Sequence, residues 1–184
     1  MTRLEVPGTV RVSVAVLAER RPGVTRWAEW AWRVVEVLED APAVPPWTVL
    51  RQAAGRTLFL AGETEIVLHP TDTTNYRDNL LADPPRIWVV LRPDAVEGGP
   101  GMKLHAATVD GGEAHAYADT EADLLESLPM PPGLRAVTEA FVARHHVEQA
   151  FHKRRRDRAD PEALGGRRGG PQPAGRPAGR EEAE

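Results

Sequence analysis

A cluster of cations near the C-terminal end is the part of this sequence best suited to recognition chemistry. Five of six consecutive residues are positively charged, namely Lys153, Arg154, Arg155, Arg156 and Arg158. Guanidinium groups bind carboxylates and phosphates through paired hydrogen bonds, so the cluster predicts docking of an acidic protein surface or an anionic ligand. A solvated helix end is the simpler alternative. We favour binding because a helix terminus needs far fewer cations.

A second polar group falls in a short segment that we expect to be helical. It is the run Asn75-Tyr76-Arg77-Asp78-Asn79, and its first four residues are candidate binding residues together with Trp88 from a following strand. Asn and Asp are poor helix formers, so something other than helix propensity holds them there. They could contact a ligand or partner. Alternatively, Arg77 and Asp78 form local pairs while Tyr76 packs inward, and we favour this structural role.

Residues for covalent or metal chemistry are scarce. The chain has no cysteine, and neither of its serines, Ser13 and Ser127, lies in a Gly-x-Ser-x-Gly motif. Its six histidines lack metal-ligand spacing, since the adjacent His145 and His146 point to different helix faces. We therefore expect no catalytic residue, no metal and no cofactor.

Tryptophans Trp27, Trp30 and Trp32 are open to two interpretations. They could form an exposed binding stripe, or pack in the core. We expect at least two of the five tryptophans to belong to the core, and an exposed one would mark an interface.

Composition and charge divide the 184 residues into three parts. Residues 1–150 carry 14 basic and 21 acidic residues and predict a β-rich globular domain ending in a helix. Residues 151–164 contain the basic cluster and extend that helix. Residues 165–184 contain no Leu, Ile, Val, Met or aromatic residue, and we expect them to be disordered. No targeting segment or transmembrane helix is visible, so we expect a cytoplasmic protein without membrane association.

Alternating apolar residues predict most of the strands. The expected strands cover residues 10–16, 31–38, 47–52, 57–61, 65–69, 87–91 and 102–107. Residues 27–38 also fit a helical stripe, although their β-branched residues favour a strand. The segment 121–128 fits a short helix or an edge segment equally well.

Two helices complete the expected fold. Thr71 and Asp72 cap a short helix that turns Tyr76 and Leu80 inward, and Pro131-Pro132 opens a helix running to about residue 150. The predicted class is α+β: a strongly curved or barrel-like antiparallel sheet of about seven strands, with a short lateral helix and a packed C-terminal helix.

Three runs of residues resemble a known family. They are residues 43–50 (Ala-Val-Pro-Pro-Trp-Thr-Val-Leu), residues 75–80 together with 87–93, and residues 145–164, which contain the basic cluster. Over residues 9–164 the chain resembles a bacterial domain-of-unknown-function family that is usually encoded beside formate dehydrogenase genes. Members are often labelled molybdopterin-guanine dinucleotide biosynthesis protein A. The resemblance implies formate dehydrogenase or its maturation factors as partners.

The sequence departs from the guanylyltransferase that this label describes. That enzyme opens with a strand followed by a Leu-Ala-Gly-Gly-like loop, whereas Glu19-Arg20-Arg21-Pro22-Gly23 follows the first strand here. The order of elements also lacks the alternation of strands and helices. We therefore expect a non-enzymatic accessory protein of molybdenum cofactor or formate dehydrogenase biogenesis. The alternatives are a molybdopterin guanylyltransferase-like enzyme, which would use GTP and magnesium, and a nucleic-acid-binding protein acting through the basic cluster. The acidic body disfavours the latter.

Overall fold

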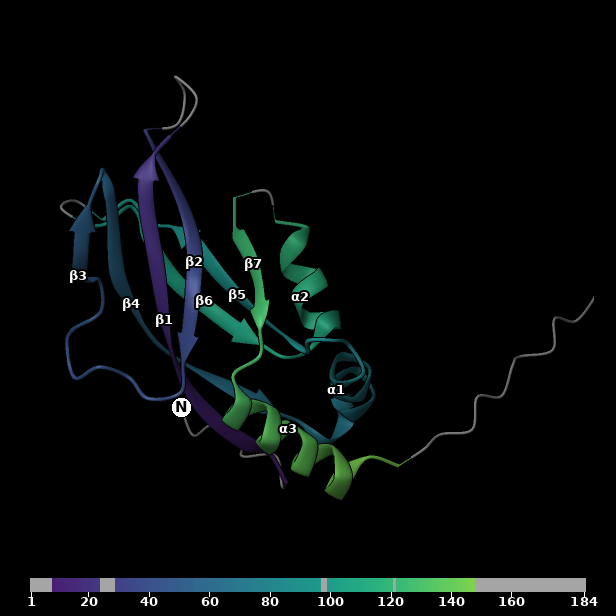
Figure 1. The fold of residues 1–184 in the computed structure, drawn as a ribbon. Coiled ribbons are helices and arrows are strands. Elements are labelled where there is room, and N and C mark those ends of the chain that lie inside the picture. Colours follow the sequence, from purple (N-terminus) through teal and green to yellow (C-terminus); the bar gives the residue numbers. More distant parts are fainter. Residues whose placement is uncertain (1–7, 24–28, 97–98, 121, 148–184) are drawn as a thin grey trace, which may run out of the picture. The chain divides into compact units, whose positions relative to one another are not determined.

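Seven strands form two antiparallel sheets in the computed structural model, which describes residues 8–23, 29–96, 99–120 and 122–147 (Figure 1). The first sheet has the order β2-β1-β4-β3 and consists of β1 (Val10–Pro22), β2 (Trp30–Leu38), β3 (Thr48–Ala53) and β4 (Arg56–Leu68). The second has the order β6-β5-β7 and consists of β5 (Arg86–Pro93), β6 (Met102–Thr108) and β7 (Leu124–Pro129).

The predicted α+β class is confirmed, but a single barrel-like sheet is not. The described strands divide between two sheets, and no ladder of hydrogen bonds joins one described sheet to the other. Contacts between β4 and β6, and between β2 and β7, hold the sheets together instead. The main hydrophobic core lies between them and includes Leu68, Ile87 and Leu91, all fully buried.

Three α-helices belong to the described residues. They are α1 (Thr73–Leu80), which follows a 3-10 turn at Pro70–Asp72, α2 (Gly111–Ala118) and α3 (Pro132–His145). The short lateral helix and the C-terminal helix were predicted, whereas α2 was not. Helix α1 contacts both α2 and α3. None of the described helices has the length and apolar character needed to cross a membrane.

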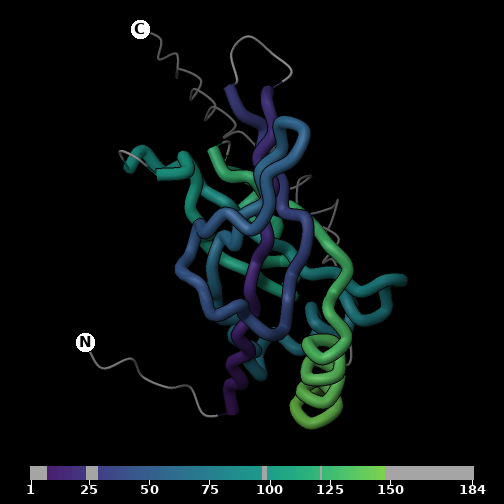
Figure 2. The backbone as a smooth tube through the Cα atoms, turned by 60° about the vertical axis from the view of Figure 1, so that its left-hand side comes forward, coloured from purple at the N-terminus to yellow at the C-terminus, as the bar shows by residue number. Residues whose placement is uncertain are grey.

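Strand β1 is one of the two internal strands of the first sheet, and Figure 2 shows it running from the α3 end of the described domain to the opposite end. Every residue from Val14 to Glu19 is buried. Val14, Val16 and Ala18 face the main core, while Ala15 and Leu17 face a smaller cluster on the other side of the sheet. The sheet is therefore covered on both faces around β1.

Both neighbours of β1 contain a β-bulge near Leu17. The extra residue is Ala61 in β4 and Val35 in β2. Gly62 follows the first bulge with φ 140°, a conformation that residues with a Cβ rarely adopt. The prediction of separate strands over 57–61 and 65–69 was wrong, because this glycine bends one continuous strand instead of ending it.

Other expectations have mixed outcomes. The preference for a strand at 31–38 is confirmed by β2. The undecided segment 121–128 contains β7, which pairs with β5.

Asp72 occupies the N-cap position of α1, but its side chain makes no capping hydrogen bond. Helix α3 ends at His145 and not near residue 150, because the backbone of His146 is extended. The predictions for residues 151–184 lie outside the described residues.

Candidate functional site

A polar pocket of about 480 Å³ lies between β4 and β6, beside α1 and α2. Strand β3 pairs only with residues 56–60 of β4, and β6 is an edge strand of the second sheet. The pocket therefore lies where two strand edges face each other without a described strand between them. Its lining residues are Thr64, Glu65, Val67, His69, Asp72, Tyr76, His105, Ala106, Ala107, Thr108, Asp110 and Glu113.

Asn75 and Asp110 join the two short helices at this pocket. The Asn75 Nδ2 group donates to both carboxylate oxygens of Asp110, at 2.8 and 3.0 Å. Asp110 is also the N-cap residue of α2, and its Oδ1 accepts hydrogen bonds from the backbone N–H groups of Gly112 and Glu113. One buried carboxylate thus fixes the start of α2 and its position against α1.

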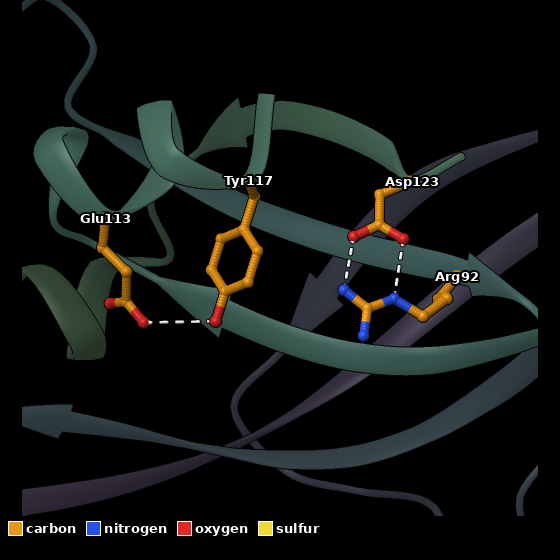
Figure 3. Close-up of polar contacts among 4 residues, drawn as sticks. All are labelled: Arg92, Glu113, Tyr117 and Asp123. Carbon is orange, nitrogen blue, oxygen red and sulfur yellow. Dashed lines mark hydrogen bonds and ion pairs between the residues drawn. The ribbon is translucent and has the colours of Figure 1, made fainter. Parts of the chain in front are cut away.

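Thr108 extends this network along the pocket wall. Its hydroxyl donates to Glu113 Oε2 at 2.6 Å and accepts from the backbone N–H of Asp110 at 3.0 Å. The other oxygen of Glu113 accepts a longer hydrogen bond of 3.4 Å from the Tyr117 hydroxyl, one turn further along α2 (Figure 3). The Glu113 carboxylate is therefore held from both sides.

Tyr76 provides a buried hydroxyl at the pocket. Its side chain packs against Phe141 of α3, and its oxygen accepts a hydrogen bond of 3.1 Å from the backbone N–H of His69. Burial is the main cause that raises the pKa of Tyr76 to about 12, while Asp72 and Asp110 add negative charge nearby. The hydroxyl therefore keeps its proton at neutral pH and is a potential donor to a ligand.

Arg92 and Asp123 form a bidentate ion pair close to the far end of α2 (Figure 3). The two N···O distances are 2.7 and 2.6 Å, and the Asp123 side chain is fully covered. Hydrogen bonding from Arg92 lowers the pKa of Asp123. This pair connects the segment that follows α2 to β5, close to Tyr117.

The structure separates the predicted helical residues into two groups. Tyr76 lines the pocket and Asn75 hydrogen-bonds to the lining residue Asp110, whereas Arg77 and Asp78 do not line the pocket. Arg77 Nη1 donates to His146 Nε2 at 3.2 Å, and Arg77 Nη2 lies 3.7 Å from the exposed carboxylate of Asp78. Because arginine only donates, the other ring nitrogen of His146 carries the proton and donates to Thr73. These contacts connect α1 to the end of α3 and agree with the structural role that we favoured.

Trp88, the other candidate residue that the structure describes, does not line the pocket. Trp88 is half-buried in β5 and lies against the first residue of α2, where a Cβ on Gly111 would be 3.6 Å from its ring. The cations Lys153, Arg154, Arg155, Arg156 and Arg158 lie outside the described residues.

Several pocket residues were missed from the sequence, among them His69, His105, Asp110 and Glu113. A signal for two of them existed: an Asp followed three residues later by Glu is a typical helix start. The histidines carried no such signal. His105 reaches the pocket from a bulge in β6, where it is the extra residue opposite β5, and its ring packs on Tyr117.

The pocket presents more acceptors than donors. Four carboxylates line it, from Glu65, Asp72, Asp110 and Glu113, and Arg11 pairs with Glu65 at 3.1 Å. A ligand group with several N–H donors and a positive charge, such as a lysine or arginine side chain, complements this surface. Within the part of the chain that the structure describes, no three His, Asp or Glu residues are arranged to hold a metal ion.

Comparison with known proteins identifies one family. A family model described as a protein of unknown function (DUF3305) matches residues 13–155. No curated protein and no solved structure matches the chain. The expected resemblance to a domain-of-unknown-function family is thus confirmed, while its link to formate dehydrogenase stays a prediction.

Proposed function

The chain belongs to the DUF3305 family, and from this premise we propose that it is a non-enzymatic accessory protein that acts by binding. The proposed partner is a molybdenum-dependent formate dehydrogenase or one of its maturation factors, as the sequence resemblance implies. In this proposal the polar pocket receives a cationic side chain of the partner. The cations at residues 153–158 contact an acidic surface of the same partner.

The observation that carries the proposal is the fixed hydrogen bonding of the pocket's polar groups. Asp110 accepts from Asn75 and from two backbone N–H groups of α2, and Glu113 accepts from Thr108. Side chains held in this way present a preorganised surface, which lowers the entropic cost of binding.

The guanylyltransferase-like alternative receives less support from the fold. Doubly wound nucleotide-binding folds place the nucleotide beyond the carboxyl ends of parallel strands. Every described strand pair in this protein is antiparallel.

Binding is tested with the tagged full chain and purified formate dehydrogenase with its maturation factors. We expect capture of one of these proteins by the unchanged chain. Neutralising Arg154, Arg155, Arg156 and Arg158 with glutamine should reduce the captured amount at least tenfold.

One further variant addresses the pocket, and a second variant is its control. Glu65→Gln combined with Asp72→Asn removes two pocket charges without touching the cap of α2, and should also reduce capture several-fold. Asp78→Asn is the matched control, because it removes an exposed charge outside the pocket, and it should leave capture unchanged. Absence of capture, or equal effects of all variants, would contradict the proposal. Consumption of GTP in the presence of magnesium by the purified chain would favour the enzyme instead.

A further inference from the structure

A second pocket, of about 310 Å³, lies on the core-facing side of the first sheet and shares no lining residue with the polar pocket. Arg20, Trp47 and Phe59 line it, with Gln52 and Thr57. Arg20 continues the row of β1 residues that faces the main core, since it follows Ala18 by two positions. A cation at the end of an apolar row is unusual, because buried charge requires compensation.

Arg20 has aromatic neighbours but no carboxylate partner. Its guanidinium lies 4.3 Å from the ring centre of Trp30, 5.4 Å from that of Phe59 and 5.7 Å from that of Trp32. Its Nε is buried without a hydrogen-bond partner, and no carboxylate among the described residues forms an ion pair with it. The adjacent Glu19 is already occupied, because it pairs with Arg33 and Arg56.

The wall of this pocket is built from fixed aromatic rings. Trp47 packs edge-on against Trp32 and Phe59, with ring centres 5.7 and 6.0 Å apart. Its backbone is in the left-handed region, with φ 62°, and its N–H donates to the carbonyl of Leu60. Such a conformation is rare for a bulky residue and persists only where the surroundings enforce it. The Trp47 indole is therefore held in place in the wall of the pocket that Arg20 also lines.

From these contacts we propose that this pocket binds a small organic anion, a carboxylate or a phosphate monoester, carried on a flat ring. The unpaired N–H groups of Arg20 bind the oxyanion, since a guanidinium fork matches its geometry. Trp47 and Phe59 contact the ring through offset or edge-to-face packing. The volume is at the lower end of ligand pockets, which run from roughly 300 to 1,000 Å³, and suits a single ring. This inference is independent of the proposed accessory function.

The test uses the full chain and phenyl phosphate as the probe, followed by the indole N–H signals in two-dimensional NMR. We expect saturable shifts of the Trp47 and Trp30 signals, with little change at Trp88, which lies in the second sheet. Arg20→Gln should weaken the affinity at least tenfold. Arg21→Gln is the matched control: it removes an exposed neighbouring cation that points to the other side of β1, and it should change the affinity less than twofold.

Three comparisons define the ligand class. Benzoate should bind as phenyl phosphate does, benzylammonium should not bind, and inorganic phosphate should bind much more weakly because it has no ring. No saturable shift with either aromatic anion, equal binding of benzylammonium or inorganic phosphate, or equal effects of the two arginine variants would overturn the proposal. If Arg20→Gln does not fold, Gln52→Glu places a negative charge at the exposed edge of the pocket. It should weaken phenyl phosphate binding at least threefold, and unchanged affinity would equally overturn the proposal.

Discussion

At the residue scale, Asn75 and Asp110 do the most to define the polar pocket. Their side chains come from different helices, and the carboxylate of Asp110 also supplies the N-cap of α2. An amide that donates to a buried carboxylate contributes more than an average hydrogen bond. The same polar run contains Asp78, which is exposed and pairs only loosely with Arg77.

This contrast predicts different costs for two alanine substitutions on α1. Asn75→Ala should lower the free energy of unfolding by about 1–2 kcal/mol, because it leaves the Asp110 carboxylate with one donor fewer. Asp78→Ala should change it by less than about 0.5 kcal/mol, as is usual for exposed positions. Urea unfolding of both variants measures the difference. Equal costs would mean that the hydrogen bond between Asn75 and Asp110 contributes nothing to stability.

Tyr76 predicts a loss of stability in strongly alkaline solution. Its pKa is raised by burial from 10.0 to about 12 in the folded protein, so the unfolded chain releases the phenolic proton at lower pH. The stabilising contribution is fully present below pH 10 and is lost as the pH rises from 10 to 12. Tyr76→Phe should flatten the decrease in unfolding free energy over this range.

Tyr117 is the control for that measurement, since it is the other of the two tyrosines and its pKa is also raised, by burial first and by Glu113. The decrease in unfolding free energy between pH 10 and pH 12 that remains in Tyr76→Phe should disappear in the variant that lacks both phenols. An alkaline profile unchanged by Tyr76→Phe would show that this phenol does not titrate differently on folding.

At the element scale, α3 begins with a cap that comes from another part of the chain. Pro131 occupies the N-cap position and has no side-chain donor or acceptor, but Glu39 at the end of β2 accepts a 2.6 Å hydrogen bond from the Leu134 N–H. A carboxylate also interacts favourably with the positive end of the helix dipole. Gly133 makes room for this cap, because a Cβ there would overlap the Glu39 carboxylate.

Because a side chain at position 133 would occupy the space of the Glu39 carboxylate, the effect of Gly133→Ala on the free energy of unfolding should change sign when Glu39 is removed. Glu39→Ala should cost about 1 kcal/mol, the usual value for a lost helix cap. Gly133→Ala should destabilise the unchanged protein, because it displaces the capping carboxylate. In the Glu39→Ala background the same substitution should stabilise by up to about 1 kcal/mol, since alanine is the better helix former.

A double-mutant cycle by thermal or urea unfolding measures this coupling. Additive effects of the two substitutions would contradict the cap, since residues that share no contact do not couple.

At the scale of the whole molecule, the polar pocket and the Arg20 pocket lie at different places relative to the two sheets. The polar pocket lies where β4 and β6 face each other without a described strand between them, and the Arg20 pocket lies on the core-facing side of the first sheet. The first is rich in carboxylates and the second contains an unpaired cation. Under our two proposals, the described domain recognises ligands of opposite charge at separate sites.

Much of this fold could be predicted because strand patterns are local. Strands β1, β2, β5 and β6 alternate or run apolar over short segments, and α3 shows helical spacing after its prolines. The errors arose where a local signal had two meanings. Gly62 lies in the gap between two predicted strands, but in the structure it lies beside a bulge within one strand. The pattern of residues 121–128 fitted a helix as well as an edge segment, and pairing with β5 makes part of it a strand.

The sequence by itself therefore determined the α+β class, most of the strand-forming segments and the C-terminal helix, and it singled out Asn75 and Tyr76 as candidates. Only the tertiary structure decided that the strands form two sheets, that Glu39 caps a helix 95 residues away, and that Asp110 meets Asn75 across 35 residues. It also placed Arg20 among rings from three other segments. The physical reason is that hydrophobic periodicity fixes which side of an element is buried, whereas strand register and bulges fix which side chains meet.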